Sequence, residues 1–219
     1  MRQIPIFLVA AILFPFAVRA QATKGVPVFE IAEAESTIKF NVKASVAVEG
    51  TFDKWNAKLT FRSRDVTTGV LDLKIQAGSV NTGNGMKNSR LKSEDFFDAE
   101  RNPLITFRSK RIVQTGPQSF ETVGDFTIRG VTKPEKLKLT IMGERTGLGD
   151  IKGAMAFDRK DYGMDKDIPF VKIADRVEVT VDLKVKQVSG PRLVYQGVDH
   201  LPSATRVTTV AKSGITYKP

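Results

Sequence analysis

Apolar and polar side chains alternate with a period of two through most of the chain between residues 37 and 185. Val177 to Val185 is the clearest case, because every odd-numbered position in it is apolar. This spacing is typical of β-strands that bury one face and expose the other. The pattern recurs in eight stretches: residues 37–44, 55–62, 71–77, 105–109, 126–128, 137–141, 151–157 and 177–185.

Eight half-buried strands joined by turns predict an all-β, antiparallel fold. A closed up-and-down barrel fits this pattern, and a two-sheet sandwich is the competing arrangement. Closure is favoured because it removes exposed strand edges, which invite aggregation. No stretch has a sustained helical period, so we expect one short helix at Ser89–Phe97, at one end of the barrel. An eight-stranded barrel is near the size at which its interior is either filled or holds one slim ligand. Periodicity alone favours the filled interior.

The connection between Ser79 and Ser109 is unusual, because it mixes a long polar loop with large aromatic side chains. Asn84-Gly85 is a turn signal, since both residues tolerate positive φ. Phe96 and Phe97 then place two rings in an otherwise polar segment, and such rings must pack on something. We expect them to pack over the open end of the barrel. Long loops in compact domains are often lids or binding loops, so the part from Asn84 to Phe97 is predicted to form the ligand's portal.

Three ordered blocks of this connection resemble a known family. They read S-V-x-T-G-x-G-M from Ser79, L-x-S-x-D-F-F-D from Leu91 and I-T-F-R-S from Ile105. The similarity continues in Gly124–Lys133 and in Arg159–Met164. The chain thus resembles the YceI-like family of periplasmic, lipocalin-like polyisoprenoid-binding proteins, over most of its length from residue 29 to residue 187.

This resemblance implies an eight-stranded lipocalin-like barrel that holds an extended prenyl chain along its axis. Members of the family often carry a His-Ser pair before the first strand and a further His after it. Here the corresponding residues are Ala34-Glu35-Ser36-Thr37, without His, so no role resting on those histidines is expected.

Both ends of the chain differ in character from the barrel. Residues 1–22 have a positive charge near the start at Arg2, continue through an apolar run and end in Ala20-Gln21-Ala22. This pattern predicts a cleaved secretory signal peptide. An uncleaved anchor is the alternative. Residues 23–188 are predicted to be the barrel, and residues 189–219 a C-terminal tail beyond the break at Gly190-Pro191. We therefore expect a periplasmic protein with no transmembrane segment in its mature form.

Composition excludes several kinds of site. The chain has no Cys and one His, His200, so thiol chemistry, a zinc site and a Ser-His-Asp triad are not expected. Carboxylate pairs such as Asp95 with Asp98 flank turns, where capping is their more ordinary role. The net charge is +10, but the basic residues are dispersed, which favours solvated strand faces over a nucleic-acid surface. No enzyme activity, metal or cofactor is predicted.

Arg159 has two interpretations. Its guanidinium either binds turn carbonyls or a carboxylate such as Asp161, or it faces the anionic head of a ligand. The structural interpretation is favoured.

The predicted function is the binding of a long apolar lipid, most simply a polyisoprenoid, inside the barrel. The alternative is an exported, solid-cored interaction or stress domain without a lipid. A homodimer is left open. Met86 and Leu91 are expected to add apolar contacts at the portal. The predicted ligand-binding residues are Phe40, Phe61, Leu73, Phe96, Phe97, Phe107, Phe126, Ile128, Leu139, Met155 and Phe157, with Lys87, Arg90 and Lys92 as cations for a head group.

Overall fold

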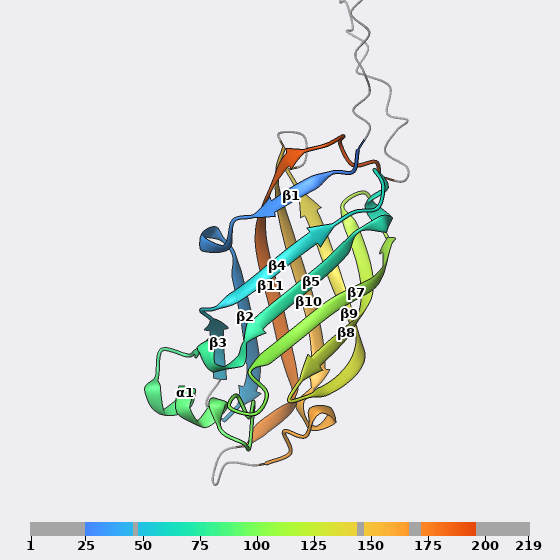
Figure 1. Ribbon diagram of the computed structural model, residues 1–219. Helices are drawn as coiled ribbons and strands as arrows, with labels where there is room; N and C mark the ends of the chain where they lie inside the picture. The colour runs from blue at the N-terminus through green and yellow to red at the C-terminus, as the bar shows by residue number, and fades with distance from the viewer. Residues whose placement is uncertain (1–24, 46–47, 144–146, 167–171, 196–219) are drawn as a thin grey trace, which may run out of the picture.

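The computed structural model describes residues 25–45, 48–143, 147–166 and 172–195 (Figure 1). Within these ranges, eleven strands form one sheet whose paired neighbours run antiparallel. The strands are β1 (Val28–Ile31), β2 (Thr37–Ala44), β3 (Val48–Phe52), β4 (Trp55–Thr60), β5 (Val70–Gln76), β6 (Val80–Asn81), β7 (Leu104–Gln114), β8 (Ser119–Ile128), β9 (Val131–Met142), β10 (Leu148–Asp158) and β11 (Ile173–Ser189).

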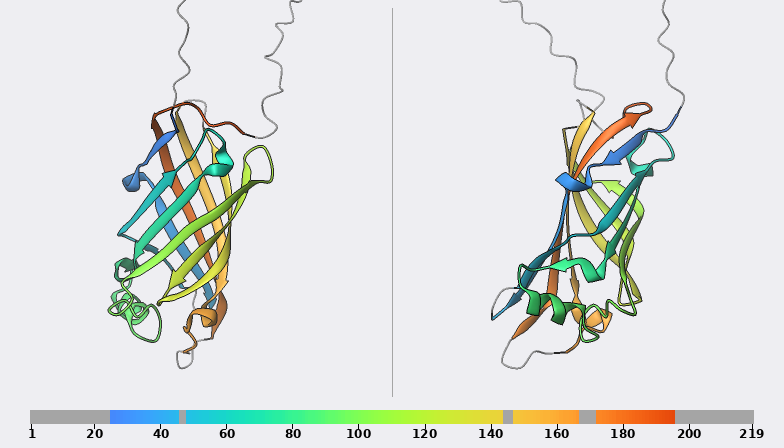
Figure 2. Two further views of the ribbon diagram at one scale, coloured as in Figure 1. Left: turned by 45° about the vertical axis from the view of Figure 1, so that its right-hand side comes forward. Right: turned by 60° about the vertical axis from the view of Figure 1, so that its left-hand side comes forward.

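The sheet curls around a common axis, as Figure 2 shows. Its strand order is β4-β5-β7-β8-β9-β10-β11-β2-β3-β6, and β1 pairs with β11 beside this path. Side chains at and just beyond the ends of β1 and β4 meet across the gap between these two strands, which are not hydrogen-bonded to each other. The rings of Phe29 and Phe61 lie 5.5 Å apart, and Asn56 Nδ2 donates to Glu33 Oε1 at 2.9 Å. These contacts bring the first and fourth strands together, which gives the sheet its barrel shape.

The predicted all-β, lipocalin-like fold is confirmed, but the number of strands is eleven and not eight. All eight alternating stretches are strands. The additional strands are β1, β3 and β6, which have four, five and two residues respectively. Segments this short contain too few positions for an alternation to be recognised in the sequence. They lie beside the longer strands and extend the sheet at its margins.

The inward-facing residues of the long strands make one continuous apolar core. In β2, Ile38, Phe40 and Val42 are buried while their neighbours are exposed. The same alternation runs through β8, from Phe120 to Ile128. Full burial of one such side chain stabilises the fold by about 1.5–3 kcal/mol. The period-two pattern therefore determines which face of the sheet closes on itself.

The helix α1 (Gly85–Lys92) begins earlier than expected. The sequence interpretation placed it at Ser89–Phe97 and took Asn84-Gly85 for a turn, and this was wrong. The Asn84 side chain accepts a hydrogen bond from the Lys87 backbone N–H at 3.1 Å, so Asn84 is the N-cap. At the other end, Ser93 Oγ donates to the Arg90 carbonyl at 2.7 Å. Residues 93–98 form the turn that carries Phe96 and Phe97.

The two ends of the described chain lie at the end of the barrel opposite α1 (Figure 1). Residues 190–195, here called the strap, follow β11 across that end. Val194 is held on both sides, because its N–H donates to the Arg64 carbonyl at 2.8 Å and its carbonyl accepts from Val66 N–H at 3.2 Å. The predicted signal peptide and most of the predicted tail lie outside the described residues. Among the described residues, no helix has the length and apolar character needed to cross a bilayer.

Candidate ligand-binding site

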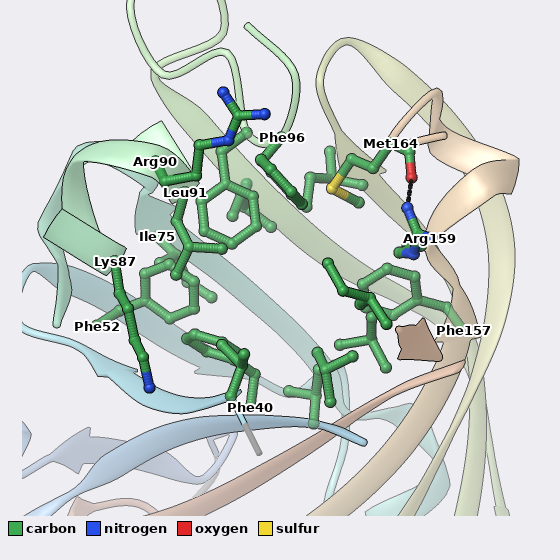
Figure 3. A pocket seen from close by; sticks show the side chains of 18 of the residues that line it. Phe40, Phe52, Ile75, Lys87, Arg90, Leu91, Phe96, Phe157, Arg159 and Met164 are labelled. Atoms are coloured by element: carbon green, nitrogen blue, oxygen red, sulfur yellow. Dashed lines mark hydrogen bonds between the residues drawn. The ribbon is translucent and has the colours of Figure 1, made fainter. Parts of the chain in front are cut away.

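An apolar cavity of about 290 Å³ opens at the α1 end of the barrel (Figure 3). We call it the α1 chamber. Its walls are strand residues: Ile38, Phe40 and Val42 of β2, Val48 and Phe52 of β3, Ile75 of β5, Ile105 of β7, Phe126 and Ile128 of β8, Phe157 of β10, and Ile173, Val177 and Val179 of β11. Its mouth carries Met86, Lys87, Arg90, Leu91, Phe96, Phe97, Arg159 and Met164.

Six phenyl rings of the described residues line the chamber. Phe40 and Phe52 have ring centroids 5.6 Å apart, and Phe97 lies 6.3 Å from the first and 5.9 Å from the second. On the other wall, Phe126 and Phe157 are 5.0 Å apart. These separations are those of ordinary aromatic packing, which makes the wall rigid as well as apolar. Such a surface can hold a hydrocarbon chain but offers it no hydrogen bond.

Two cations of α1 border the mouth. Arg90 lies above the Phe96 ring, with its guanidinium carbon 5.6 Å from the ring centroid, and it pairs with Asp95 at 2.9 Å. Lys87 lies one turn earlier on α1, and no carboxylate of the described residues is within ion-pair distance of it. Beside them, Met86 is 83% exposed, which is unusual for a large apolar side chain. The mouth therefore combines an apolar edge with positive charge.

Arg159 holds the turn that forms the opposite side of the mouth. The guanidinium is buried and lies within the short 3₁₀ turn η5 (Arg159–Tyr162). It donates to the carbonyls of Met164, Lys166 and Ala174, the last two at 3.1 and 3.3 Å, and it pairs with Asp175 at 3.1 Å. Figure 3 shows its bond to Met164. The favoured structural interpretation of Arg159 is confirmed, with Asp175 in place of Asp161 as the carboxylate.

Charged neighbours change the acidity of two groups near this turn. A hydrogen bond from Lys160 is the main reason why the pKa of Asp175 lies below its ordinary value, and Arg159 adds to the effect. Burial, followed by the hydrogen bond to Glu135 at 2.9 Å, raises the pKa of the Tyr162 hydroxyl. Both groups therefore keep their ordinary charge at neutral pH, and neither is prepared for proton transfer.

The remaining carboxylates near the mouth cap or pair locally. Asp158 accepts from the Lys160 backbone N–H at 2.9 Å, and Asp98 accepts from Asn102 Nδ2 at 3.0 Å. The first contact is a backbone cap of the expected kind, whereas the second joins two side chains, and Asp98 also pairs with Arg101 at 4.0 Å. In the described part of the chain, no group of three or more His, Asp or Glu side chains could hold a metal ion. The lone His200 lies outside that part.

A second cavity, of about 340 Å³, lies at the opposite end of the barrel beneath the strap. We call it the tail chamber. Its lining is more polar than that of the α1 chamber and includes Gly147, Gly149, Gln187 and Arg192. Its other lining residues are Phe29, Leu59, Phe61, Val66, Leu71, Ile112, Leu139, Ile141, Ile151, Val185, Leu193 and Tyr195.

A packed layer separates the two chambers, and we call it the waist. It consists of the inward residues that line neither chamber and lie between those that do. These are Leu73 on β5, Phe107 on β7, Met155 on β10, and Val181 and Leu183 on β11, all buried. Glycine makes the packing close. A Cβ atom at Gly124 would lie 2.6 Å from Phe107 Cζ, and one at Gly153 would lie 2.5 Å from Val181 Cγ2.

The structure divides the predicted ligand-binding residues among these regions. Eight of them line the α1 chamber: Phe40, Phe96, Phe97, Phe126, Ile128, Phe157, Lys87 and Arg90. Phe61 and Leu139 line the tail chamber, and Leu73, Phe107 and Met155 belong to the waist. Lys92 borders neither chamber. Alternation along a strand indicates which side chains point inward, but it does not indicate how far along the barrel axis each of them lies.

Several lining residues were not predicted. Ile38, Val42, Ile75, Ile105, Val177 and Val179 share the phase of the residues that were, so the same alternation could have found them. Val48 and Phe52 lie on β3, which the sequence interpretation did not identify as a strand. Arg159 and Met164 reach the mouth through the η5 turn, and Ile173 begins β11 before its alternation is regular.

The model of the YceI-like domain matches residues 29–185 of this chain. The chain belongs to the YceI-like domain family. The match begins in β1, ends within β11 and contains all but a few of the residues around both chambers. The strap lies beyond it.

Relatives and solved structures agree with this assignment. A UPF0312 protein of Shewanella denitrificans is 28% identical over 169 residues, covering 73% of this chain and 85% of its own. The YCEI protein of Campylobacter jejuni has 25% identity and a TM-score of 0.55, over 65% of this chain and 86% of its own. A domain of Saccharophagus degradans described as polyisoprenoid-binding shares the fold, at 15% identity and a TM-score of 0.59, over 74% and 99% of the two chains.

Proposed function

We propose that this YceI-like protein binds an apolar lipid of the polyisoprenoid class in the α1 chamber, as a periplasmic protein exported by its N-terminal signal. One observation carries the proposal: a cavity of about 290 Å³ whose walls are aliphatic and phenyl side chains. The fold shared with a domain described as polyisoprenoid-binding supports the choice of ligand class. The amino-acid composition of residues 1–22 supports export.

The physical basis is transfer of hydrocarbon from water. Burial of each methylene-sized group contributes about 0.8 kcal/mol, without any directional bond. A branched and unsaturated prenyl chain is stiffer than a saturated acyl chain, so it loses less conformational entropy when it is confined. Recognition would then depend on the width and length of the chain. Rigid rings such as Phe40 and Phe157 set the width.

The waist sets the direction in which the lipid lies. Because Phe107 and its neighbours fill the middle of the barrel, the chain enters through the mouth beneath α1 with its apolar end first. The head group then stays at the mouth, near Lys87 and Arg90. The alternative of a solid-cored interaction domain receives less support, because a solid core would not contain an apolar cavity that opens to solvent.

A lipid is expected to copurify with the protein when no detergent is used. Native mass spectrometry and organic extraction would detect it. Val179→Trp is the control, because Val179 lines the α1 chamber, is half-buried, and gains volume that fills the cavity. The variant should fold and carry less lipid. Lipid-free parent protein that also fails to bind added farnesol would contradict the proposal.

The cations of the mouth should matter for a phosphorylated lipid and not for a neutral one. Replacing both Lys87 and Arg90 by Gln is expected to weaken binding of farnesyl phosphate about fivefold at low salt, because exposed ion pairs contribute little each. Binding of farnesol should not change. Lys92→Gln is the matched control, since Lys92 lies on the same helix but borders neither chamber. Equal affinities of the double variant and the parent for farnesyl phosphate would place the head group elsewhere.

A further inference from the structure

The tail chamber is a site in its own right. We propose that it binds a second ligand, a single-chain amphiphile with an anionic head group, independently of the α1 chamber. Its volume of about 340 Å³ lies at the small end of the range of ligand pockets, which is about 300–1,000 Å³. The site is therefore large enough for a short apolar chain.

The waist makes the two sites independent. On β7, Phe107 is 2% exposed and lies between Ile105 of the α1 chamber and Ile112 of the tail chamber. On β11, Leu183 is fully buried between the same two regions. A ligand that ran through the whole barrel would have to displace these packed side chains. Each chamber can instead be occupied without any change in the waist.

The lining of the tail chamber fits an amphiphile. The inner wall is apolar and includes Leu59, Leu71 and Phe61, whereas Gln187 and Arg192 lie at the rim. Gln187 Nε2 is engaged with the strap, because it donates to the carbonyls of Gly190 and Pro191 at 3.0 and 2.9 Å. The exposed guanidinium of Arg192 has no carboxylate partner among the described residues. It is thus available to a carboxylate or phosphate head group.

The strap keeps Arg192 at the rim. Arg64 Nε donates to the Arg192 carbonyl at 3.3 Å, and the bonds of Val194 to Arg64 and Val66 fix the next turn of the chain. At the end of the strap, the Tyr195 ring packs 5.9 Å from Phe120. Opposite the strap, Leu148 lines the chamber while remaining 57% exposed. An apolar edge together with a cation on an anchored segment of backbone is the arrangement that a single-chain amphiphile would require.

Titration of the full chain with the fluorescent fatty acid 11-(dansylamino)undecanoic acid tests the number of sites. Two sites per chain are expected. Leu59→Trp fills the tail chamber, and Val179→Trp is its matched counterpart in the α1 chamber, since both residues are half-buried strand residues that line one cavity each. Each variant should lose one of the two sites, by at least about tenfold in affinity. Circular dichroism establishes that both variants fold.

Two results would overturn the inference. If Leu59→Trp leaves the titration unchanged, the tail chamber does not bind the probe. If each of the two substitutions, made separately, removes all binding, the interior is one continuous site. Loss of binding only in Leu59→Trp would instead contradict the proposed function of the α1 chamber while supporting the tail site. The two proposals can therefore fail separately.

The head group is tested by Arg192→Gln. At low salt this change should weaken binding of the fatty acid to the tail site about threefold, which is the effect of one exposed charge pair. Binding of the corresponding neutral methyl ester should not change. Arg62→Gln is the control, because Arg62 is an exposed arginine of the same end of the barrel that lines neither chamber. Equal weakening of acid and ester would overturn the assignment of Arg192 to an anionic head.

Discussion

Replacement of Phe107 by Asp is expected to prevent the barrel from folding. The Phe107 side chain is 2% exposed, lies beside its cross-strand neighbours Leu73 and Phe126, and packs over Gly124. Loss of the ring alone costs about 3–5 kcal/mol. An unpaired buried carboxylate adds a desolvation cost of several kcal/mol, which is about as large as the cost of losing the ring. The sum approaches the whole stability of an ordinary domain, about 5–15 kcal/mol.

Leu104→Asp is the matched control for this experiment. It introduces the same carboxylate on the same strand, but Leu104 faces outward and is 43% exposed. Its effect on the free energy of unfolding should stay within about 0.5 kcal/mol. Circular dichroism and thermal unfolding compare the two. If Phe107→Asp unfolds cooperatively near the parent's melting temperature, Phe107 does not fill the waist.

Phe107→Ala separates the ring's role in stability from its role as a barrier. This variant should fold, with a loss of about 3–5 kcal/mol. Because the cavity left by the ring lies between the two chambers, the variant should also bind a long prenol such as undecaprenol more tightly than the parent does. Unchanged stability would show that the ring does not face inward.

The waist shows which features of the barrel interior can be predicted from the sequence and which cannot. Alternation placed Phe107, Leu73 and Met155 on the inward face, and the structure buries all three. These residues nevertheless form the layer that divides the interior, and their shared position along the barrel axis depends on the stagger of each strand relative to its neighbours. That stagger is a property of the assembled sheet. A prediction from one strand at a time cannot contain it.

The helix and the short strands show a different kind of limit. Asn84-Gly85 is compatible with both a turn and a helix start, and the choice depends on the bond between Asn84 and the Lys87 N–H. Strand β3 owes its existence to its pairing with β2 and β6. Its residue Phe52 is a principal part of the chamber wall, and nothing in the local sequence marks it. Pairing between distant segments decides these features.

Arg159→Met is expected to destabilise the protein by about 1–3 kcal/mol, because it keeps the apolar stem but leaves hydrogen-bond acceptors around a buried guanidinium without their donor. Asp175 and the carbonyls of Met164, Lys166 and Ala174 would each lose a donor. Lys160→Met is the matched control. Lys160 pairs with the same Asp175 at 2.9 Å, but its side chain is 50% exposed, so its loss should cost less than about 1 kcal/mol.

The Arg159→Met substitution should also weaken ligand binding. The η5 turn places Met164 at the mouth of the α1 chamber and packs Tyr162 against Phe126 and Phe157, at 5.4 and 5.2 Å. Loosening that turn moves one wall of the chamber, so affinity for farnesol should fall in Arg159→Met and remain unchanged in Lys160→Met. Calorimetric unfolding and a farnesol titration measure the two effects. A guanidinium that served only as a head-group contact would give the opposite pattern, with normal stability and a loss confined to phosphorylated lipids.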